Sequence, residues 1–220
     1  MSGAVALAGF VLVGGQSLRM GTNKALLDYH GVPLALYIAE KLKEVTENVS
    51  LVGDPVLYGH LGLPVVRDRE VGRGPLSGIE AALNSDTAEE WNLIAACDMP
   101  SLNAGLFIAL QRKAAAAGSE IDCIVPVTGS VTGLATSQAS GGKLQPLCAA
   151  YRRRCGTVVT MALENGTRRV VDVIAMLQAE VWPAEDAQLF QNVNTRPEWI
   201  QFLRGSQAVQ PHDRRISTLS

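Results

Sequence analysis

Two adjacent glycines and two cationic residues follow the first apolar run of the chain. The run ends at Val13, and Gly14, Gly15, Arg19 and Lys24 come after it. Glycines let backbone N–H groups approach phosphate oxygens, and fixed positive charges neutralise those oxygens. The loop matches neither GxxxxGK[ST] nor GxGxxG, so it is neither a P-loop nor a dinucleotide fingerprint. The pattern predicts a loop that binds a nucleoside triphosphate, with a glycine turn carrying solvated charges as the alternative.

A carboxylate follows another apolar run. Asp98 comes directly after residues 93–97 and is followed by Met99 and Pro100. Because Mg²⁺ binds few protein carboxylates together with phosphate oxygens and water, Asp98 is predicted to be a magnesium ligand. The alternative role is the N-cap of the helix that begins near Leu102.

A third segment joins Asp68 to the glycine-rich stretch 72–78. Asp68 would hydrogen-bond a ribose or base, or orient a metal-bound group, and Ser77 would bring a small hydroxyl near the ligand. An ordinary turn with salt-bridged charges explains the same residues equally well.

A fourth segment places the amides Asn192 and Asn194 on either side of a valine. Thr195 after them is suited to cap a helix. We predict a ligand-binding role for the two amides in addition to that structural role.

Strand-like and helix-like segments alternate along the chain. Apolar runs predict strands over 10–13, 49–52, 64–66, 93–97, 121–127 and 147–151, and helical periodicity predicts helices over 34–45, 76–83, 102–117, 155–164 and 169–177. The alternation predicts an α/β, Rossmann-like, doubly wound and mostly parallel sheet with helices on both faces. In such sheets ligands bind beyond the carboxyl ends of the strands, so Gly14, Asp68 and Asp98 are expected in one crevice.

The remaining segments set the domain boundaries. Residues 128–143 are rich in Gly, Ser and Thr and predict a loop or weak hairpin. Residues 1–204 are expected to form a single domain, and 205–220 a mobile polar tail.

Composition argues against several classes of partner. The formal charge of -2 and the pI of about 5.9 do not favour a nucleic-acid partner. The apolar N-terminus lacks a basic region and is too short to span a bilayer, so we expect a cytoplasmic protein without a membrane partner. The four cysteines, at 97, 123, 148 and 155, lack metal-site spacing and predict buried thiols in a reducing compartment.

The stretch at 12–27, LVGGQSLRMGTNKALL, resembles the signature LAGGxSxRMGxDK of the molybdenum cofactor guanylyltransferase family. Later pieces follow in that family's order: GPLSGI at 74–79, CDMP at 97–100, QPLCAAY at 145–151 and NVNT at 192–195. The resemblance covers about residues 7–203. Departures from the family pattern are Val13 for Ala, Asn23 for Asp and Gln145 for His. Gly53 or Asp54 stands where some members have an asparagine that contacts the nucleotide.

The resemblance implies transfer of GMP from GTP to the terminal phosphate of molybdenum-bound molybdopterin, with release of pyrophosphate and with Mg²⁺ as cofactor. It also implies molybdoenzymes or other cofactor-biosynthesis proteins as further partners. The family's nucleotide contacts fall on Leu12, Val13, Gly14, Lys24, Asp68 and Asp98, and Asp98 is also the magnesium ligand. Asn192 and Asn194 fall on the molybdopterin side.

Attack by a phosphate oxygen on the α-phosphorus needs no protein nucleophile, because positioning and charge neutralisation supply most of the catalysis. We assign Arg19 and Lys24 to the β- and γ-phosphates, backbone N–H groups to Gly14 and Gly15, and magnesium binding to Asp98. Three alternatives stay open: a cytidylyltransferase for the same cofactor, a nucleotidyltransferase for another small molecule, and a non-catalytic nucleotide-binding module. Relatives that use CTP tend to read LAAG and DQP, so Gly14 and Met99 favour guanine.

Overall fold

A central mixed sheet organises the chain. The structure is a computed structural model that describes residues 5–14, 23–68, 74–129 and 142–208. Gly15 and Arg19 therefore lie outside the described residues. The sheet has eight strands in the order β10-β7-β9-β6-β1-β4-β5, with β8 paired to β7. Its strands are β1 (Leu7–Leu12), β4 (Val49–Gly53), β5 (Val65–Arg67), β6 (Trp91–Ala96), β7 (Cys123–Thr128), β8 (Lys143–Leu144), β9 (Cys148–Arg152) and β10 (Ala179–Pro183).

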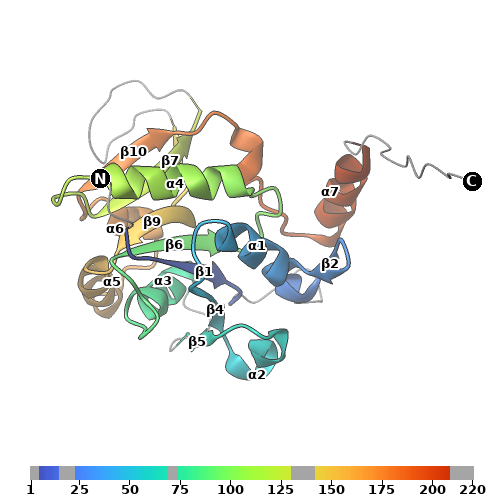
Figure 1. The fold of residues 1–220 in the computed structure, drawn as a ribbon, viewed down its shortest axis with the longest axis horizontal. Coiled ribbons are helices and arrows are strands. Elements are labelled where there is room, and N and C mark those ends of the chain that lie inside the picture. The colour runs from blue at the N-terminus through green and yellow to red at the C-terminus, as the bar shows by residue number, and fades with distance from the viewer. Residues whose placement is uncertain (1–4, 15–22, 69–73, 130–141, 209–220) are drawn as a thin grey trace, which may run out of the picture.

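The helices surround this sheet, and a small hairpin stands apart from it (Figure 1). The helices are α1 (Leu34–Lys43), α2 (Pro55–Tyr58), α3 (Pro75–Leu83), α4 (Ala104–Ala116), α5 (Cys155–Glu164), α6 (Val170–Ile174) and α7 (Arg196–Ala208). Short 3-10 turns are η1 (Lys24–Leu26), η2 (Gly59–Leu61) and η3 (Ala187–Phe190). The hairpin consists of β2 (Asp28–Tyr29) and β3 (Val32–Pro33).

The strand order reverses at β1. This strand pairs in parallel with β4 on one side and with β6 on the other, and β5 continues in parallel beyond β4. The antiparallel strand β9 joins β6 to β7, and β10 pairs in parallel with β7. The prediction of a mostly parallel, Rossmann-like sheet is confirmed. A ligand crevice is expected at the reversal, beyond the carboxyl ends of β1 and β6.

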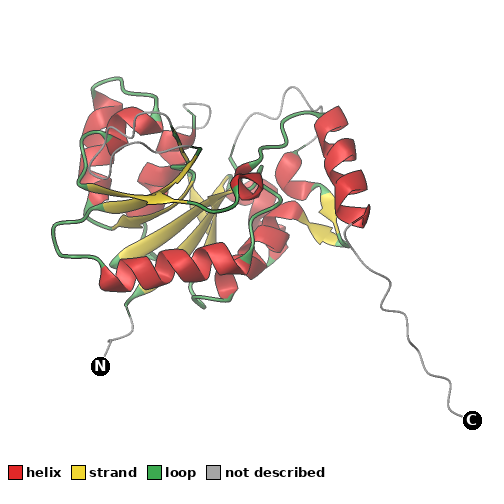
Figure 2. Ribbon diagram, turned by 90° about the horizontal axis from the view of Figure 1, so that it is seen from above, coloured by secondary structure: helices red, strands yellow, loops and turns green. Residues whose placement is uncertain are grey.

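Helices cover both faces of the sheet, as Figure 2 shows from above. All six residues of β1 are buried because the strand contributes to two cores. Val11 belongs to the core beneath α1 and α4, and Phe10 belongs to the core beneath α3, α5 and α6. The apolar stripe predicted for the first helix is buried there: Leu34, Ile38 and Leu42 are at most 1% exposed. Burial on both faces explains why the strands are continuous apolar runs.

The structure changes several predicted boundaries. The helix α7 continues to Ala208, so residues 205–208 are helical, whereas the predicted tail begins at 205. Residues 209–220 lie outside the described residues, and their mobility stays a prediction. The helix predicted over 169–177 is shorter, Val170–Ile174. Thr128 pairs with Lys143 in an antiparallel register, which forms the arms of the predicted hairpin, while 130–141 lie outside the described residues.

Aromatic side chains join α7 to the β2–β3 hairpin, and both lie at the same end of the molecule in Figure 1. The ring of Tyr29 lies 4.6 Å from Tyr37, 5.7 Å from Trp199 and 5.4 Å from Phe202, measured between centroids. The segment before α7 is held near the end of β6 by a hydrogen bond of 2.8 Å from the N–H of Val193 to the carbonyl oxygen of Asp98. Among the described helices, none has the length and apolar character needed to cross a membrane.

Candidate active site

The end of β1 lies beside a buried carboxylate. The N–H groups of Val13 and Gly14 both donate to the carbonyl oxygen of Val52, at 3.0 and 3.2 Å. A Cβ at Gly14 would lie 3.7 Å from Oδ2 of Asp68, so the backbone of the predicted phosphate loop begins next to that carboxylate. The structure therefore brings Gly14 and Asp68 together, as the sequence predicts.

The start of α3 holds Asp68 in place. Asp68 follows β5 and is 9% exposed. The hydroxyl of Ser77 lies 3.1 Å from Oδ2 of Asp68 and 2.9 Å from the carbonyl oxygen of Gly74. Gly74 has a positive φ of 88° and Pro75 occupies the first turn of α3, which favours a sharp entry into the helix. The hydroxyl of Ser77, which the sequence predicts near the ligand, thus orients the carboxylate of Asp68.

Asp98 lies just beyond β6 and has a buried carboxylate oxygen. Among the described residues, no hydrogen-bond donor reaches its Oδ1. Burial raises the pKa of this carboxyl above its ordinary value, and the positive charge of Lys24 opposes that rise. The N-cap of α4 is Asn103, whose Oδ1 accepts from the N–H of Leu106 at 3.0 Å. The alternative role of Asp98 as the cap of that helix is therefore excluded.

A buried carboxylate oxygen that no described donor reaches fits a hard cation, and the lysine nearby suits the phosphates that such a cation would accompany. In the described part of the chain, no three His, Cys, Asp or Glu side chains gather as a metal site. Asp98 would therefore share a cation with oxygens from the substrate and from water, the mode that Mg²⁺ prefers. Asp68 follows β5, three strand spacings from β6, or about 14 Å at 4.8 Å per strand. The carboxylate of Asp68 nevertheless reaches the end of β1, the strand next to β6, because its Oδ2 lies 3.7 Å from the position of a Cβ at Gly14.

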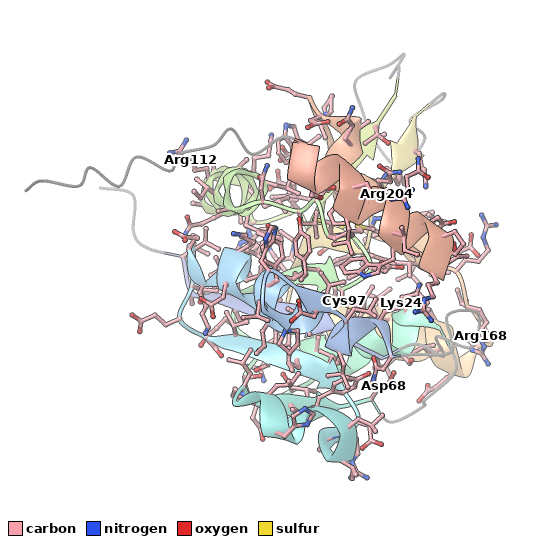
Figure 3. The ribbon with its side chains drawn as sticks, turned by 90° about the vertical axis from the view of Figure 1, so that its right-hand side faces the viewer. Lys24, Asp68, Cys97, Arg112, Arg168 and Arg204 are labelled. Carbon is pink, nitrogen blue, oxygen red and sulfur yellow. The ribbon has the colours of Figure 1, made fainter. Side chains whose placement is uncertain are left out.

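Lys24 opens the turn η1, close to Asp98. The side chain of Asn23 accepts from the N–H of Ala25 at 3.1 Å and caps this turn. The Nζ of Lys24 donates to Oδ1 of Asn194 at 2.8 Å, although 170 positions separate the two residues. Lys24 and Cys97 lie close together in Figure 3, with Asp68 below them. Burial raises the pKa of the Cys97 thiol to about 12, so it stays protonated at neutral pH.

The two amides of the fourth segment face different surroundings. Asn194 accepts from Lys24, and Asn192 lines a cavity of about 210 Å³ next to Met99. The other lining residues come from β8, the segment before β9, and α6: Lys143, Leu144, Gln145, Pro146, Leu147, Val170 and Val171. The carboxylate of Glu198 accepts from the N–H groups of Asn194 and Thr195. The backbone N–H of Glu198 donates to Oγ1 of Thr195 at 3.4 Å, which confirms a cap at the start of α7.

Tyr58 also lies at this edge and was not predicted. The hydroxyl of Tyr58 donates to the carbonyl oxygen of Val13 and accepts from Asn23, both at 2.8 Å. Gly53 makes room for Tyr58, because a Cβ there would lie 2.9 Å from its ring. Asp54 caps α2 by accepting from the N–H of Val56 at 2.9 Å. The positions left open for a nucleotide contact thus have structural roles. No pattern in the sequence singles out Tyr58.

A strand that ends in glycine, a lysine and a buried carboxylate at the switch point of a doubly wound sheet are features of a nucleotide-binding enzyme. Comparison with known proteins shows which one. The chain belongs to the family of the MobA-like NTP transferase domain, whose model matches residues 9–181. The expected family and its nucleotidyltransferase activity are thereby confirmed.

Relatives and solved structures agree with this assignment. A protein of Carboxydothermus hydrogenoformans named probable molybdenum cofactor guanylyltransferase is 31% identical over 201 residues, which cover 88% of this chain and 93% of that protein. One of the same name from Trichormus variabilis is 33% identical over 202 residues, covering 90% and 91%. Molybdopterin-guanine dinucleotide biosynthesis protein A from Archaeoglobus fulgidus shares the fold, with a TM-score of 0.73 at 21% identity over 92% of this chain and 100% of that one.

Proposed function

We propose that this protein transfers GMP from GTP to the terminal phosphate of molybdenum-bound molybdopterin and releases pyrophosphate. The observation that carries the proposal is the buried Oδ1 of Asp98, which lies near Lys24 and has no hydrogen-bond partner in the described part of the chain. It supplies a cation ligand beside a phosphate-binding charge. The printed names of the guanylyltransferase relatives support the choice of nucleotide and acceptor.

In this mechanism an oxygen of the acceptor phosphate attacks the α-phosphorus of GTP, and the bond to the bridging oxygen breaks. Lys24, together with Arg19, neutralises the charge that develops on the leaving pyrophosphate. The backbone N–H of Gly15 binds a phosphate oxygen, and Asp68 binds the nucleoside part of GTP. The N–H predicted to do the same at Gly14 instead donates to the carbonyl oxygen of Val52 at 3.2 Å. Asp98 would hold Mg²⁺, which supplies positive charge to the phosphate oxygens when bound.

The acceptor approaches from the side of Met99 in this proposal. Asn192 lines the cavity there and offers an amide to the acceptor, while Asn194 acts through its contact with Lys24. We propose that the reaction takes place in the cytoplasm, where the four free, buried cysteines would stay as thiols.

Measuring pyrophosphate release with GTP, CTP and ATP, each with and without molybdenum-bound molybdopterin, tests the proposal. We expect Mg²⁺-dependent turnover that requires GTP and the acceptor together. Preference for CTP would instead identify a cytidylyltransferase, and turnover only with a different phosphorylated acceptor would identify another nucleotidyltransferase. Nucleotide binding without turnover on any acceptor would indicate a non-catalytic module.

A further inference from the structure

Tyr58 ties three segments of the site together. Its hydroxyl lies 2.8 Å from the carbonyl oxygen of Val13, where β1 ends, and 2.8 Å from Nδ2 of Asn23, which precedes Lys24. Tyr58 is only 3% exposed, and its ring packs against the backbone of Gly53 at the end of β4. The short helix α2 is therefore fixed against the ends of β1 and β4 and against the turn that carries Lys24.

The chemistry of the two ends determines the direction of each hydrogen bond. The carbonyl of Val13 can only accept, so Tyr58 uses its single hydroxyl proton there. The N–H of Ala25 can only donate, so Oδ1 of Asn23 accepts from it, and the amide Nδ2 of Asn23 faces Tyr58. Burial raises the pKa of Tyr58, which keeps the hydroxyl protonated at neutral pH. Only an uncharged side chain with a donor and an acceptor at position 23 completes this chain of bonds.

We propose that Tyr58 and Asn23 are positioning residues for Lys24. Asn23 caps the three-residue turn η1, and Lys24 is the first residue of that turn. The bonds from Val13 through Tyr58 to Asn23 thus orient the turn so that the ammonium of Lys24 reaches Asn194 and the neighbourhood of Asp98. The inference rests on the proposed function, since it takes Lys24 to bind the phosphates of the nucleotide.

Removing the hydroxyl tests the connection to Lys24. Tyr58→Phe keeps the ring against Gly53 but leaves the carbonyl of Val13 and the amide of Asn23 without this partner. We expect GTP to bind about tenfold more weakly, the effect of a lost hydrogen bond within a buried array. In a Lys24→Ala background the same change should weaken binding less than about twofold, because the residue being positioned is gone.

Tyr29→Phe is the matched control. Tyr29 is also buried, at 6% exposure, and its hydroxyl lies 3.4 Å from Ser206 in α7, outside the described bonds around Lys24. Loss of that hydroxyl should change GTP binding less than about twofold. Equilibrium titration of each purified full-length chain with GTP gives these values, and circular dichroism checks that each chain is folded.

A charge change tests the bond direction. Asn23→Asp keeps an oxygen for the N–H of Ala25 but offers Tyr58 no proton, so two acceptors compete for one hydroxyl proton. We expect Asn23→Asp to weaken GTP binding about tenfold in the chain that keeps Tyr58. In the Tyr58→Phe background it should weaken binding about threefold or less relative to Tyr58→Phe alone. The remaining loss in the double variant measures the effect of a negative charge beside Lys24.

Two results would overturn the inference. One is an equal effect of Tyr58→Phe with and without the Lys24 side chain, and the other is an equal effect of Asn23→Asp with and without the Tyr58 hydroxyl. If the unaltered chain binds GTP with the expected coupling but transfers no GMP, the proposed function fails while the positioning role stands. If it binds no GTP, both fail.

Discussion

The sheet has one edge where the carboxyl ends of β1 and β6 lie and an opposite edge where these strands begin. These two edges use charged side chains in opposite ways. At the carboxyl edge, beyond β1 and β6, Asp98 keeps a buried oxygen without a described partner. At the opposite edge, where β6 begins, Arg152 is held by three groups: it donates to the carbonyl oxygens of Ile121 at 2.7 Å and Gly118 at 3.1 Å, and it pairs with Glu90. One edge therefore leaves a polar group available for a ligand, and the other uses its charge to close loops.

The neighbours of Arg152 behave in the same way. Arg153 donates to the carbonyl oxygens of Ala88 and Ser85, and Arg154 pairs with Asp122 at 2.7 Å. Three consecutive arginines look like a phosphate-binding patch in sequence, yet each is bonded within the protein. The comparison teaches that the polar atoms left unsatisfied, and not the density of charge, distinguish a ligand site from a structural clamp.

The largest effect is expected at Asp98. Asp98→Asn removes the charge for a bound cation while keeping the shape of the side chain, so GMP transfer should fall by about 10³-fold or more. The folded protein should be at least as stable as before, since a buried negative charge is removed whose Oδ1 has no hydrogen-bond partner among the described residues. Steady-state pyrophosphate release and urea denaturation measure the two quantities.

The pH dependence of stability sharpens this prediction. The pKa of Asp98 is raised above the usual 3.8 because burial penalises the charged form. The folded state therefore holds this proton to higher pH than the unfolded chain, and stability falls as the pH rises from 3.8 through the raised value. Without metal, the Asp98→Asn variant should lack that fall. A loss of stability at neutral pH in the variant would contradict the contrast between the two edges.

Lys24 should have the next largest effect. Lys24→Ala removes one charge that stabilises the leaving pyrophosphate, so kcat/KM should decrease about 100-fold, with little change in the free energy of unfolding. The loss should be carried at least partly by kcat, because the charge on the leaving group is greatest in the transition state. A change in KM alone would mean that Lys24 binds the substrate and transition state equally.

The sequence predicts most of the sheet because its strands are apolar on both faces. The runs at β1 and β6 stand out for this reason, and the predicted bounds of α5, Cys155–Glu164, match the structure. The antiparallel direction of β9 was not predictable, since strand direction depends on pairing between distant segments. The strand β10 was missed because it lies at an edge, is only partly buried and contains proline.

The site was predictable where a residue directly follows a strand. Asp98 and Asp68 have such positions, and the structure places them beyond β6 and β5. Contacts between distant residues were not predictable: Asn23 was noted only as a departure from the family pattern, and its partner Tyr58 is 35 positions away on a helix too short to show periodicity. Packing of α2 onto Gly53 makes that contact.

Arg152 gives the matching test at the opposite edge. Arg152→Ala removes the donor to the carbonyl oxygen of Gly118 and one of the two donors to that of Ile121, which Arg154 also reaches at 3.0 Å. It also removes a guanidinium that stacks 4.5 Å over the ring of Trp91, so it should lower the free energy of unfolding by about 2 kcal/mol. The kcat/KM of the folded variant should stay within about twofold. Arg154→Ala, at a half-exposed pair, is the control and should change stability by less than about 1 kcal/mol. A large loss of activity in folded Arg152→Ala would break the distinction between the edges.

Glu198 should have the smallest effect, because its exposed carboxylate caps a helix and contacts the site only through Asn194. It accepts from the N–H groups of Asn194 and Thr195, and these bonds lower its pKa below the usual 4.5. A lowered pKa contributes stability above pH 4.5 that is lost as the pH falls through the lowered value. Glu198→Gln should therefore lower Tm by about 1–2 °C at neutral pH, and the difference should shrink in acid. Thermal melts from pH 7 to pH 3 measure this, and a constant difference would show that the cap does not depend on charge. The cap also holds Asn194, which accepts from Lys24, so GTP turnover should decrease slightly. The decrease should not exceed about twofold.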